Sequence, residues 1–363
     1  MRYGSDEFSV ETLLPLIGKA EDRLARLDER VARSTLGGGF RERAHFIDVT
    51  ASMWLAGELV HLEDLVLHDA GMDIRRPTHE LTQAHTILRC RRRLCREAPK
   101  WALSEHGFAS LRGRSVPSGR NDDDVLEEDH DDDFGELAVA ETDDTLADQY
   151  AQLDAALASA DRVLEGRAGS EQSQGLVYDP DWDEESRIAD WRAIFSKADG
   201  LPPTLAAAIL WEAWERIEPL QRQHWLGNLL VGAYLRSRGK IASHLLGLSV
   251  GLKTIPRERR RARSCSERIA ACLDGLIAAA DSGLETLNRL HLAKSQMEHR
   301  LQGRRSSSSL PEVVDLLFSR PIVSVGMVAK FAKVTPRGAL NLIGEIGVRE
   351  ITGRGRYRAW GVI

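Results

Sequence analysis

Apolar residues recur every three or four positions along most of this chain, which is the spacing of the buried face of an α-helix. Residues 9–110 show the pattern four times. The first helix is predicted from Leu13, Leu14, Ile17, Ala20, Leu24 and Leu27, and the second, beginning near Arg41, from Ile47, Ala51, Trp54 and Leu55. The third follows from Leu62, Leu65, Val66 and His68, and the fourth from Leu81, Ala84, Leu88 and Leu94. A polar joint broken by glycines, residues 34–39, is expected between the first two helices.

The helical pattern returns in residues 146–302, with almost no alternation of the kind that marks strands. Its strongest element is predicted from Ile269 to Leu301. The apolar face of this helix consists of Ile269, Leu273, Leu276, Ala280, Leu284, Leu287 and Leu290. Because these positions form irregular heptads, a helix buried in the core is favoured over a coiled coil with another chain. The fold class predicted for the chain is mainly α.

Residues 112–145 interrupt the helical pattern and predict a linker. Glycine, serine and proline come first, and residues 122–144 then hold 13 acidic residues and no lysine or arginine. Such a segment buries too little apolar surface to offset the entropy lost on ordering, so an acidic disordered linker is expected. Calcium binding is the alternative, although the run lacks the spaced ligands and the glycine of an EF-hand loop.

Residues 306–363 predict a winged helix-turn-helix domain. A first helix is expected over 311–318, and Ser324 is placed to cap a second helix that carries Val325, Val328, Ala329 and Phe331. After a short turn, Thr335 and Pro336 suit the N-cap and the first position of a third helix. The inner face of that helix is predicted to hold Ala339, Leu342, Ile343 and Ile346.

The third helix of this fold enters the major groove of DNA, where its early residues reach base edges. A strand over 348–352, a turn at 353–355 and a strand over 356–360 would form the wing, with arginines on one side against phosphates and Tyr357 and Trp360 nearer the other. The predicted DNA-binding residues are Thr335, Arg337, Gly338, Asn341, Arg354, Arg356 and Arg358. Arginine pairs well with guanine and asparagine with adenine. A surface hairpin without a ligand and a protein-binding module are the alternatives.

The net charge of the chain, −6, conceals two opposite parts. Without the acidic run, the remainder carries +7, and residues 301–363 alone carry ten basic against four acidic side chains. A basic tail together with an acidic segment is typical of a nucleic-acid-binding module and a solvated linker. Two arginine-rich segments, 89–96 and 257–263, are interpreted as solvated helix faces, with phosphate contacts or docking of the linker as alternatives.

The remaining composition predicts no catalytic residue, metal site or cofactor. The four cysteines, at 90, 95, 265 and 272, lack the spacing of a structural zinc site and suit a reducing compartment. No apolar run reaches the roughly 18 residues of a membrane helix, and the first residues do not resemble a signal peptide. A cytoplasmic protein without a membrane partner is therefore expected, with a homodimer as one possible assembly.

The tail resembles the winged helix at the C-terminus of many Fic-family proteins, in its Leu-Pro start, apolar first helix and Thr-Gly-Arg wing. The segment Leu62-Glu63-Asp64-Leu65 is similar to the Leu-Glu-Asp that follows the inhibitory Ser/Thr-x-x-x-Glu-Gly motif of that family. In this register the motif falls on residues 52–57, and its glutamate is replaced by Ala56. The resemblance implies a Fic-like helical body.

The Fic catalytic loop reads His-Pro-Phe-x-(Asp/Glu)-Gly-Asn-Gly-Arg, and the nearest stretch here is QHWLGNLLVGAYLRSRGKI. Gly227 and Asn228 precede a helix as in that family, but the proline, the acidic residue and the final Gly-Arg are missing. His224 is one residue too close to this pair to be the family's general base. The resemblance therefore implies a degenerate site rather than an enzyme.

Two longer segments, HLEDLVLHDAGMDIRRPTHELTQAH and VTPRGALNLIGEIGVREITGRGRYRAWG, resemble uncharacterised plasmid-borne helix-turn-helix proteins of alphaproteobacteria. The organisation expected is an N-terminal helical region (1–111), the acidic linker (112–145), a degenerate Fic-like helical region (146–305) and the winged helix (306–363). The predicted function is that of a transcriptional regulator that binds duplex DNA. A divergent Fic-type nucleotidyl transferase and a protein-interaction scaffold are the alternatives.

Overall fold

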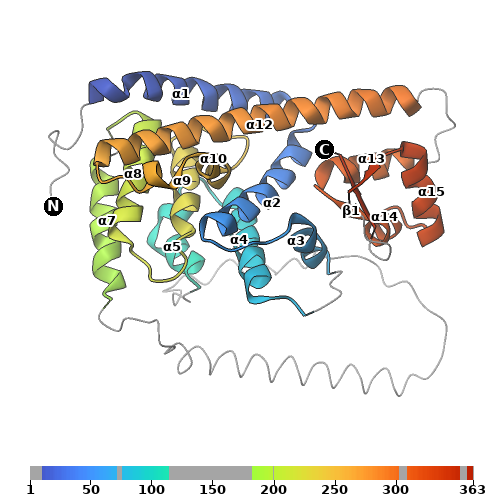
Figure 1. The fold of residues 1–363 in the computed structure, drawn as a ribbon, viewed down its shortest axis with the longest axis horizontal. Coiled ribbons are helices and arrows are strands. Elements are labelled where there is room, and N and C mark those ends of the chain that lie inside the picture. Colours follow the sequence, from blue (N-terminus) through green and yellow to red (C-terminus); the bar gives the residue numbers. More distant parts are fainter. Residues whose placement is uncertain are drawn as a thin grey trace, which may run out of the picture. The chain divides into compact units, whose positions relative to one another are not determined.

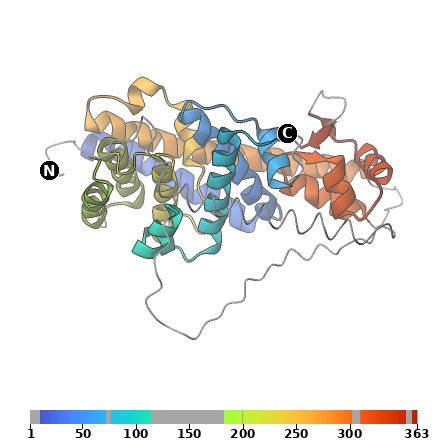
Figure 2. The same cartoon turned by 90° about the horizontal axis from the view of Figure 1, so that it is seen from below.

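Two long helices, α1 (Val10–Arg33) and α12 (Cys265–Leu301), lie side by side although more than two hundred residues separate them in the chain (Figure 1 and Figure 2). A computed structural model describes residues 10–71, 76–113, 182–198, 200–301, 309–351 and 358–362. The predicted acidic linker, apart from its first two residues, lies outside the described residues, as do Arg354, Arg356 and Tyr357.

The remaining helices of the body pack against this pair and against one another. On the N-terminal side they are α2 (Gly37–Leu55), α3 (Leu62–Asp69), α4 (His79–Arg96), the 3-10 helix η1 (Trp101–Leu103) and α5 (Glu105–Leu111). After the gap they are α7 (Glu184–Ala198), α8 (Pro203–Ile217), α9 (Leu226–Ser237), α10 (Leu248–Thr254) and α11 (Arg257–Arg260). Arg112, at the start of the predicted linker, caps α5 and forms ion pairs with Glu184 and Glu185 of α7.

Helix α12 is a core helix, as its irregular heptads predict. Its apolar face is buried along most of its length, where it contacts α1, α8 and α10. Gly251 of α10 allows a close approach, because a Cβ atom at that position would lie 1.9 Å from the carbonyl oxygen of Gly275. The two helices therefore cross with their backbones in contact.

Two expectations for α2 are wrong. The helix begins at Gly37, so the glycines of the predicted joint lie inside it. They serve close packing, because a Cβ atom on Gly39 would lie 2.5 Å from the carbonyl oxygen of Phe318 in the C-terminal domain. Trp54, predicted on the apolar face, is 45% exposed and has the ammonium group of Lys253 over its ring instead.

The C-terminal domain contains three helices and a small sheet. Helices α13 (Leu310–Ser319), α14 (Val325–Phe331) and α15 (Pro336–Ile346) match the predicted order, and Phe331, at the end of α14, is exposed. The strands are β1 (Val323–Ser324), which the sequence pattern does not predict, β2 (Arg349–Glu350) and β3 (Ala359–Gly361). All pairs are antiparallel in the order β1-β3-β2, so β3 is the central strand.

A buried arginine of α2 attaches this domain to the body. Arg43 donates hydrogen bonds to the carbonyl oxygens of Leu317 (3.0 Å), Arg320 (2.6 Å) and Val362. The first two acceptors lie at the end of α13, where helix carbonyls lack partners within the helix and attract positive charge. Burial lowers the pKa of Arg43 to about 10, so the side chain remains charged at neutral pH.

A charged network next to Arg43 joins the same two parts. Arg92 of α4 and Arg320 of the C-terminal domain both form ion pairs with Glu42 and Asp69. Both guanidinium groups also lie over the ring of buried Phe46, at 5.3 and 5.8 Å from its centroid. The orientation of the C-terminal domain is therefore fixed by hydrogen bonds, ion pairs and backbone packing together.

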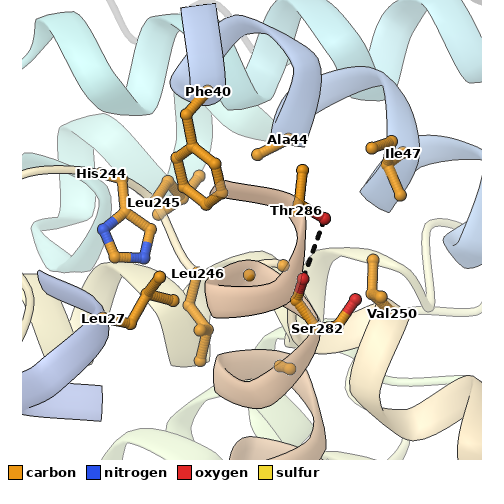
Figure 3. Close-up of a pocket in the computed structure, with 13 residues that line it drawn as sticks. Leu27, Phe40, Ala44, Ile47, His244, Leu245, Leu246, Val250, Ser282 and Thr286 are labelled. Carbon is orange, nitrogen blue, oxygen red and sulfur yellow. Dashed lines mark hydrogen bonds between the residues drawn. The ribbon is translucent and has the colours of Figure 1, made fainter. Parts of the chain in front are cut away.

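A small cavity of about 40 Å³ lies where α1, α2, α12 and the loop before α10 meet (Figure 3). Its wall is mostly apolar, with Phe40 on one side and Leu27 on another. His244 lines it beside Phe40, and the preceding residue, Ser243, donates hydrogen bonds to Asp28. The volume accommodates a few water molecules rather than an organic ligand.

Candidate nucleic-acid interface

Helix α15 has the start and the end that its sequence predicts. The side chain of Thr335 accepts a hydrogen bond from the backbone N–H of Gly338 at 3.2 Å, and Pro336 occupies the first turn. These two features satisfy an otherwise free donor and preset the backbone angle of the first residue. The helix ends at Gly347, whose φ of 72° is a left-handed conformation that favours glycine.

The two faces of α15 are clearly distinguished. Ala339, Leu342, Ile343 and Ile346 are buried, as predicted. Arg337 and Asn341 are exposed, one turn apart on the opposite face. Leu340 lies between them and is 41% exposed, which sequence reasoning did not single out. An exposed leucine among polar groups on this helix is suited to contact a thymine methyl group.

The turn that precedes α15 depends on two backbone positions. Lys333 adopts a left-handed φ of 51°, an uncommon conformation for a side chain other than glycine or asparagine. Gly338 is half-buried, and a Cβ atom there would lie 3.3 Å from the Cβ of Val334. The lack of a side chain at Gly338 therefore serves the turn, and any contact that it makes with a ligand would come from its backbone.

The wing differs from the sequence expectation in one respect. Arg358 lies over the ring of Trp360, 5.2 Å from its centroid, so Trp360 is on the same side as this arginine. Residues two apart along an extended backbone point to the same side, and Arg358 directly precedes β3, so alternation predicts this result. Trp360 is nevertheless buried, since β3 is the central strand.

Ion pairs engage two of the basic side chains in residues 301–363, Arg320 and Arg358. Arg320 faces the body, and Arg358 donates two hydrogen bonds to Glu350, at 2.9 and 2.6 Å. The Arg358 side chain lowers the pKa of Glu350, so this pair is fully ionised at neutral pH. Lys333, Arg337 and Arg349 are exposed and form no ion pair within the described residues. Lys333 and Arg349 were missed by sequence reasoning because neither lies on a predicted contact face.

The two segments that resemble Fic motifs meet in the body. Ser52 and Ala56, at the end of α2, line the same cavity as His224 and Asn228, at the start of α9. The Gly-Asn pair is used for packing in this arrangement. A Cβ atom on Gly227 would lie 2.3 Å from the ring of Trp214, and the side chain of Asn228 bonds to Trp211 and Ser249.

Other predicted groups are placed as follows. The four cysteines are free, and burial raises the pKa of Cys90, Cys95 and Cys272. No group of three or more His, Cys, Asp or Glu side chains that could hold a metal occurs among the described residues. In the same part of the chain, every helix is too short or too polar to cross a membrane.

The first arginine-rich segment is not simply a solvated helix face. Arg91 is 1% exposed and forms an ion pair with Asp48, which is equally buried. Arg92 belongs to the network at Asp69. Arg91 and Arg92 therefore face carboxylates inside the fold and not solvent, because a buried guanidinium group requires a charged partner.

The tail is a helix-turn-helix DNA-binding domain on a mainly helical protein: residues 310–363 match a family described as "HTH DNA binding domain". Residues 176–302 match a family described as "Protein of unknown function (DUF1612)". The chain is 44% identical over 384 aligned positions to the uncharacterized protein y4cF of Sinorhizobium fredii (strain NBRC 101917 / NGR234), and the alignment covers 100% of each chain. It therefore belongs to the same family as y4cF.

Proposed function

We propose that this protein is a transcriptional regulator that binds duplex DNA through α15 and the wing. The observation that carries the proposal is the capped helix α15, which presents Arg337 and Asn341 on an exposed face of a domain that matches helix-turn-helix DNA-binding domains. Arg337 would read guanine, Asn341 adenine, and the arginines of the wing would contact phosphates.

Substitutions in the two contact regions should have different effects on DNA binding. We expect Arg337→Ala or Asn341→Ala to cost about 1–3 kcal/mol on the preferred site and to relax its specificity. We expect Arg356→Ala to weaken binding to all sequences and to flatten the salt dependence by about one unit. Fluorescence anisotropy over a salt series measures both, after the genomic sites of the tagged protein have supplied a DNA sequence.

A matched control is Arg30→Ala, which removes an exposed arginine from α1 of the body. It should leave affinity and salt slope unchanged. Equal affinity of the wild-type chain and all three interface variants for DNA would exclude the interface and favour a protein-interaction scaffold. Reporter expression from the bound promoters then tests regulation separately from binding.

Nucleotide transfer is the second candidate function, because segments resembling two Fic motifs meet in one cavity. The engagement of Asn228 by Trp211 and Ser249 favours a degenerate site. Incubation of the chain and a cell lysate with labelled ATP and magnesium should therefore leave both without label. Labelling that disappears in the His224→Ala variant would instead establish a transferase.

A further inference from the structure

The cavity lined by Ser52, Ala56, His224 and Asn228 is distinct from the one in Figure 3 and is large enough for an organic molecule. It has a volume of about 270 Å³ and lies between α2, α8, α9, α10 and the arginines that follow Pro256. None of the residues that line it belongs to the C-terminal domain. Any ligand of this cavity would therefore bind away from the nucleic-acid interface.

The wall of the cavity is apolar on one part and basic on another. Its apolar part consists of Leu55, Ala56, Trp211, Trp214, Trp225 and Leu252. Its basic part consists of His224, Arg260 and Arg261, which face the carboxyl groups of Glu215 and Glu218. Neither arginine forms an ion pair within the described residues. The Nε of Arg260 donates a hydrogen bond to the carbonyl of Ile255 at 3.1 Å, which leaves its two terminal nitrogens for an added anion.

One donor in the wall has no partner. Trp225 is 8% exposed, and its indole N–H makes no hydrogen bond within the part of the chain that the structure describes. The two neighbouring tryptophans differ, because the N–H of Trp211 is bonded to Asn228 and that of Trp214 to the carbonyl of His224. An unsatisfied buried donor is costly, and this one lies beneath the surface of the cavity, so Trp225 lines the cavity through other atoms of its side chain.

The loop between α8 and α9, which forms one rim, has an unusual backbone. Glu218 has φ 47° and Gln223 has φ 64°, both left-handed conformations at residues other than glycine. Conformations of this kind cluster at ligand sites, where the surrounding structure enforces them. Here Trp214 holds the loop through the carbonyl of His224.

Two carboxyl groups, those of Glu215 and Glu218, also line the cavity. Desolvation raises the pKa of Glu215, and the charges of Arg261, His224 and Arg260 act in the opposite direction. A bound anion would therefore compete with these carboxyl groups for the basic part of the wall.

We propose that this cavity binds a small aromatic carboxylate, with its carboxylate at Arg260 and Arg261 and its ring against the tryptophans. The charge follows from the unpaired arginines, and the ring follows from the apolar remainder of the wall, where aromatic pairs add to the burial of area. This site goes beyond DNA binding and does not depend on it.

Isothermal titration of the full-length chain, without DNA, tests the proposal with 2-naphthoate as the probe and 2-naphthamide as its uncharged counterpart. Naphthoate should bind saturably, and the amide at least about tenfold more weakly, because it lacks the charge-assisted bonds to the arginines. Arg261→Gln should weaken naphthoate about tenfold. The matched control is Arg257→Gln. Arg257 is an exposed arginine of α11 that does not line the cavity, so this variant should bind naphthoate as tightly as the wild type.

Trp225→Phe is a second control inside the cavity wall. It keeps an aromatic ring and removes an unpaired N–H that lies beneath the surface of the cavity, so the affinity for naphthoate should be unchanged while the urea midpoint stays the same or rises. The proposal is overturned if naphthoate shows no saturable binding in the millimolar range, or if naphthoate and naphthamide bind equally. Unchanged naphthoate affinity in Arg261→Gln would overturn it as well.

Discussion

Arg43 is the residue on which the attachment of the DNA-binding domain most depends. It is 6% exposed and has no ion-pair partner among the described residues, and its charge is compensated by three carbonyl oxygens of the other domain. We expect Arg43→Met to lower the free energy of unfolding by about 3 kcal/mol or more, because three buried acceptors lose their donor. Urea unfolding followed by circular dichroism measures this change.

The control is Arg41→Met, two positions away on the same helix. Within the described residues, the side chain of Arg41 makes one hydrogen bond, at 3.2 Å, to the carbonyl of Ser243, and it is exposed. Its loss should change stability by no more than about 0.5 kcal/mol. If both variants unfold at the same urea concentration, the three carbonyl contacts of Arg43 do not stabilise the protein.

At the scale of elements, α2 and α13 touch through backbone atoms at Gly39. An alanine there would bring its Cβ to 2.5 Å from the carbonyl oxygen of Phe318 and 3.0 Å from its carbonyl carbon. The helices must then move apart, and such overpacking costs about 1–3 kcal/mol. We expect Gly39→Ala to lower the melting temperature in calorimetry and to loosen the C-terminal domain, seen as faster hydrogen exchange in α13.

Gly18→Ala is the corresponding change at an open helical site. Gly18 lies in the middle of α1, and nothing lies within 4 Å of the place where its Cβ would be. Alanine should raise stability there by up to about 1 kcal/mol, since it has the higher helix propensity. A Gly39→Ala variant as stable as Gly18→Ala would show that α2 and α13 do not approach so closely.

For the whole molecule, the network between body and C-terminal domain predicts a dependence on pH. Burial opposes the ionisation of Asp69, but hydrogen bonds from Arg92 and the charges of Arg92 and Arg320 outweigh burial and hold its pKa below the usual range. A carboxyl group with a depressed folded pKa stabilises the protein above its unfolded pKa of about 3.9 and loses that effect as pH falls through the folded pKa. Stability should therefore decline below about pH 4.

The Asp69→Asn variant isolates this contribution. It should be less stable than the wild type at neutral pH and should approach it under acid conditions, where the wild-type carboxyl group is protonated. Urea unfolding across the pH series gives both values. A constant difference between the two proteins at every pH would assign the stability change to shape rather than to charge. Asp28 also has a lowered pKa, because hydrogen bonds from His244 and Ser243 outweigh the effect of burial. Both proteins keep Asp28, so its contribution to acid unfolding is the same in each.

Local patterns in the sequence determined much of this protein. Helical spacing predicts α1, α3, α4 and α12, and capping chemistry at Thr335 predicts the start of α15, because caps and periodicity involve residues close in the chain. The buried and exposed faces of α15 follow from the same pattern. These features require no knowledge of what packs against them.

Only the tertiary structure decided the features that depend on distant partners. The glycines at the start of α2 resemble a loop in the sequence. In the structure they are helical, and Gly39 lies against the backbone of α13. The arginines at 91, 92 and 320 resemble surface charges, but Asp48, Asp69 and Glu42 bring them into the interior or into the attachment of the DNA-binding domain. The free energy of a charge or a glycine depends on the groups around it, and these come from segments that the local sequence does not identify.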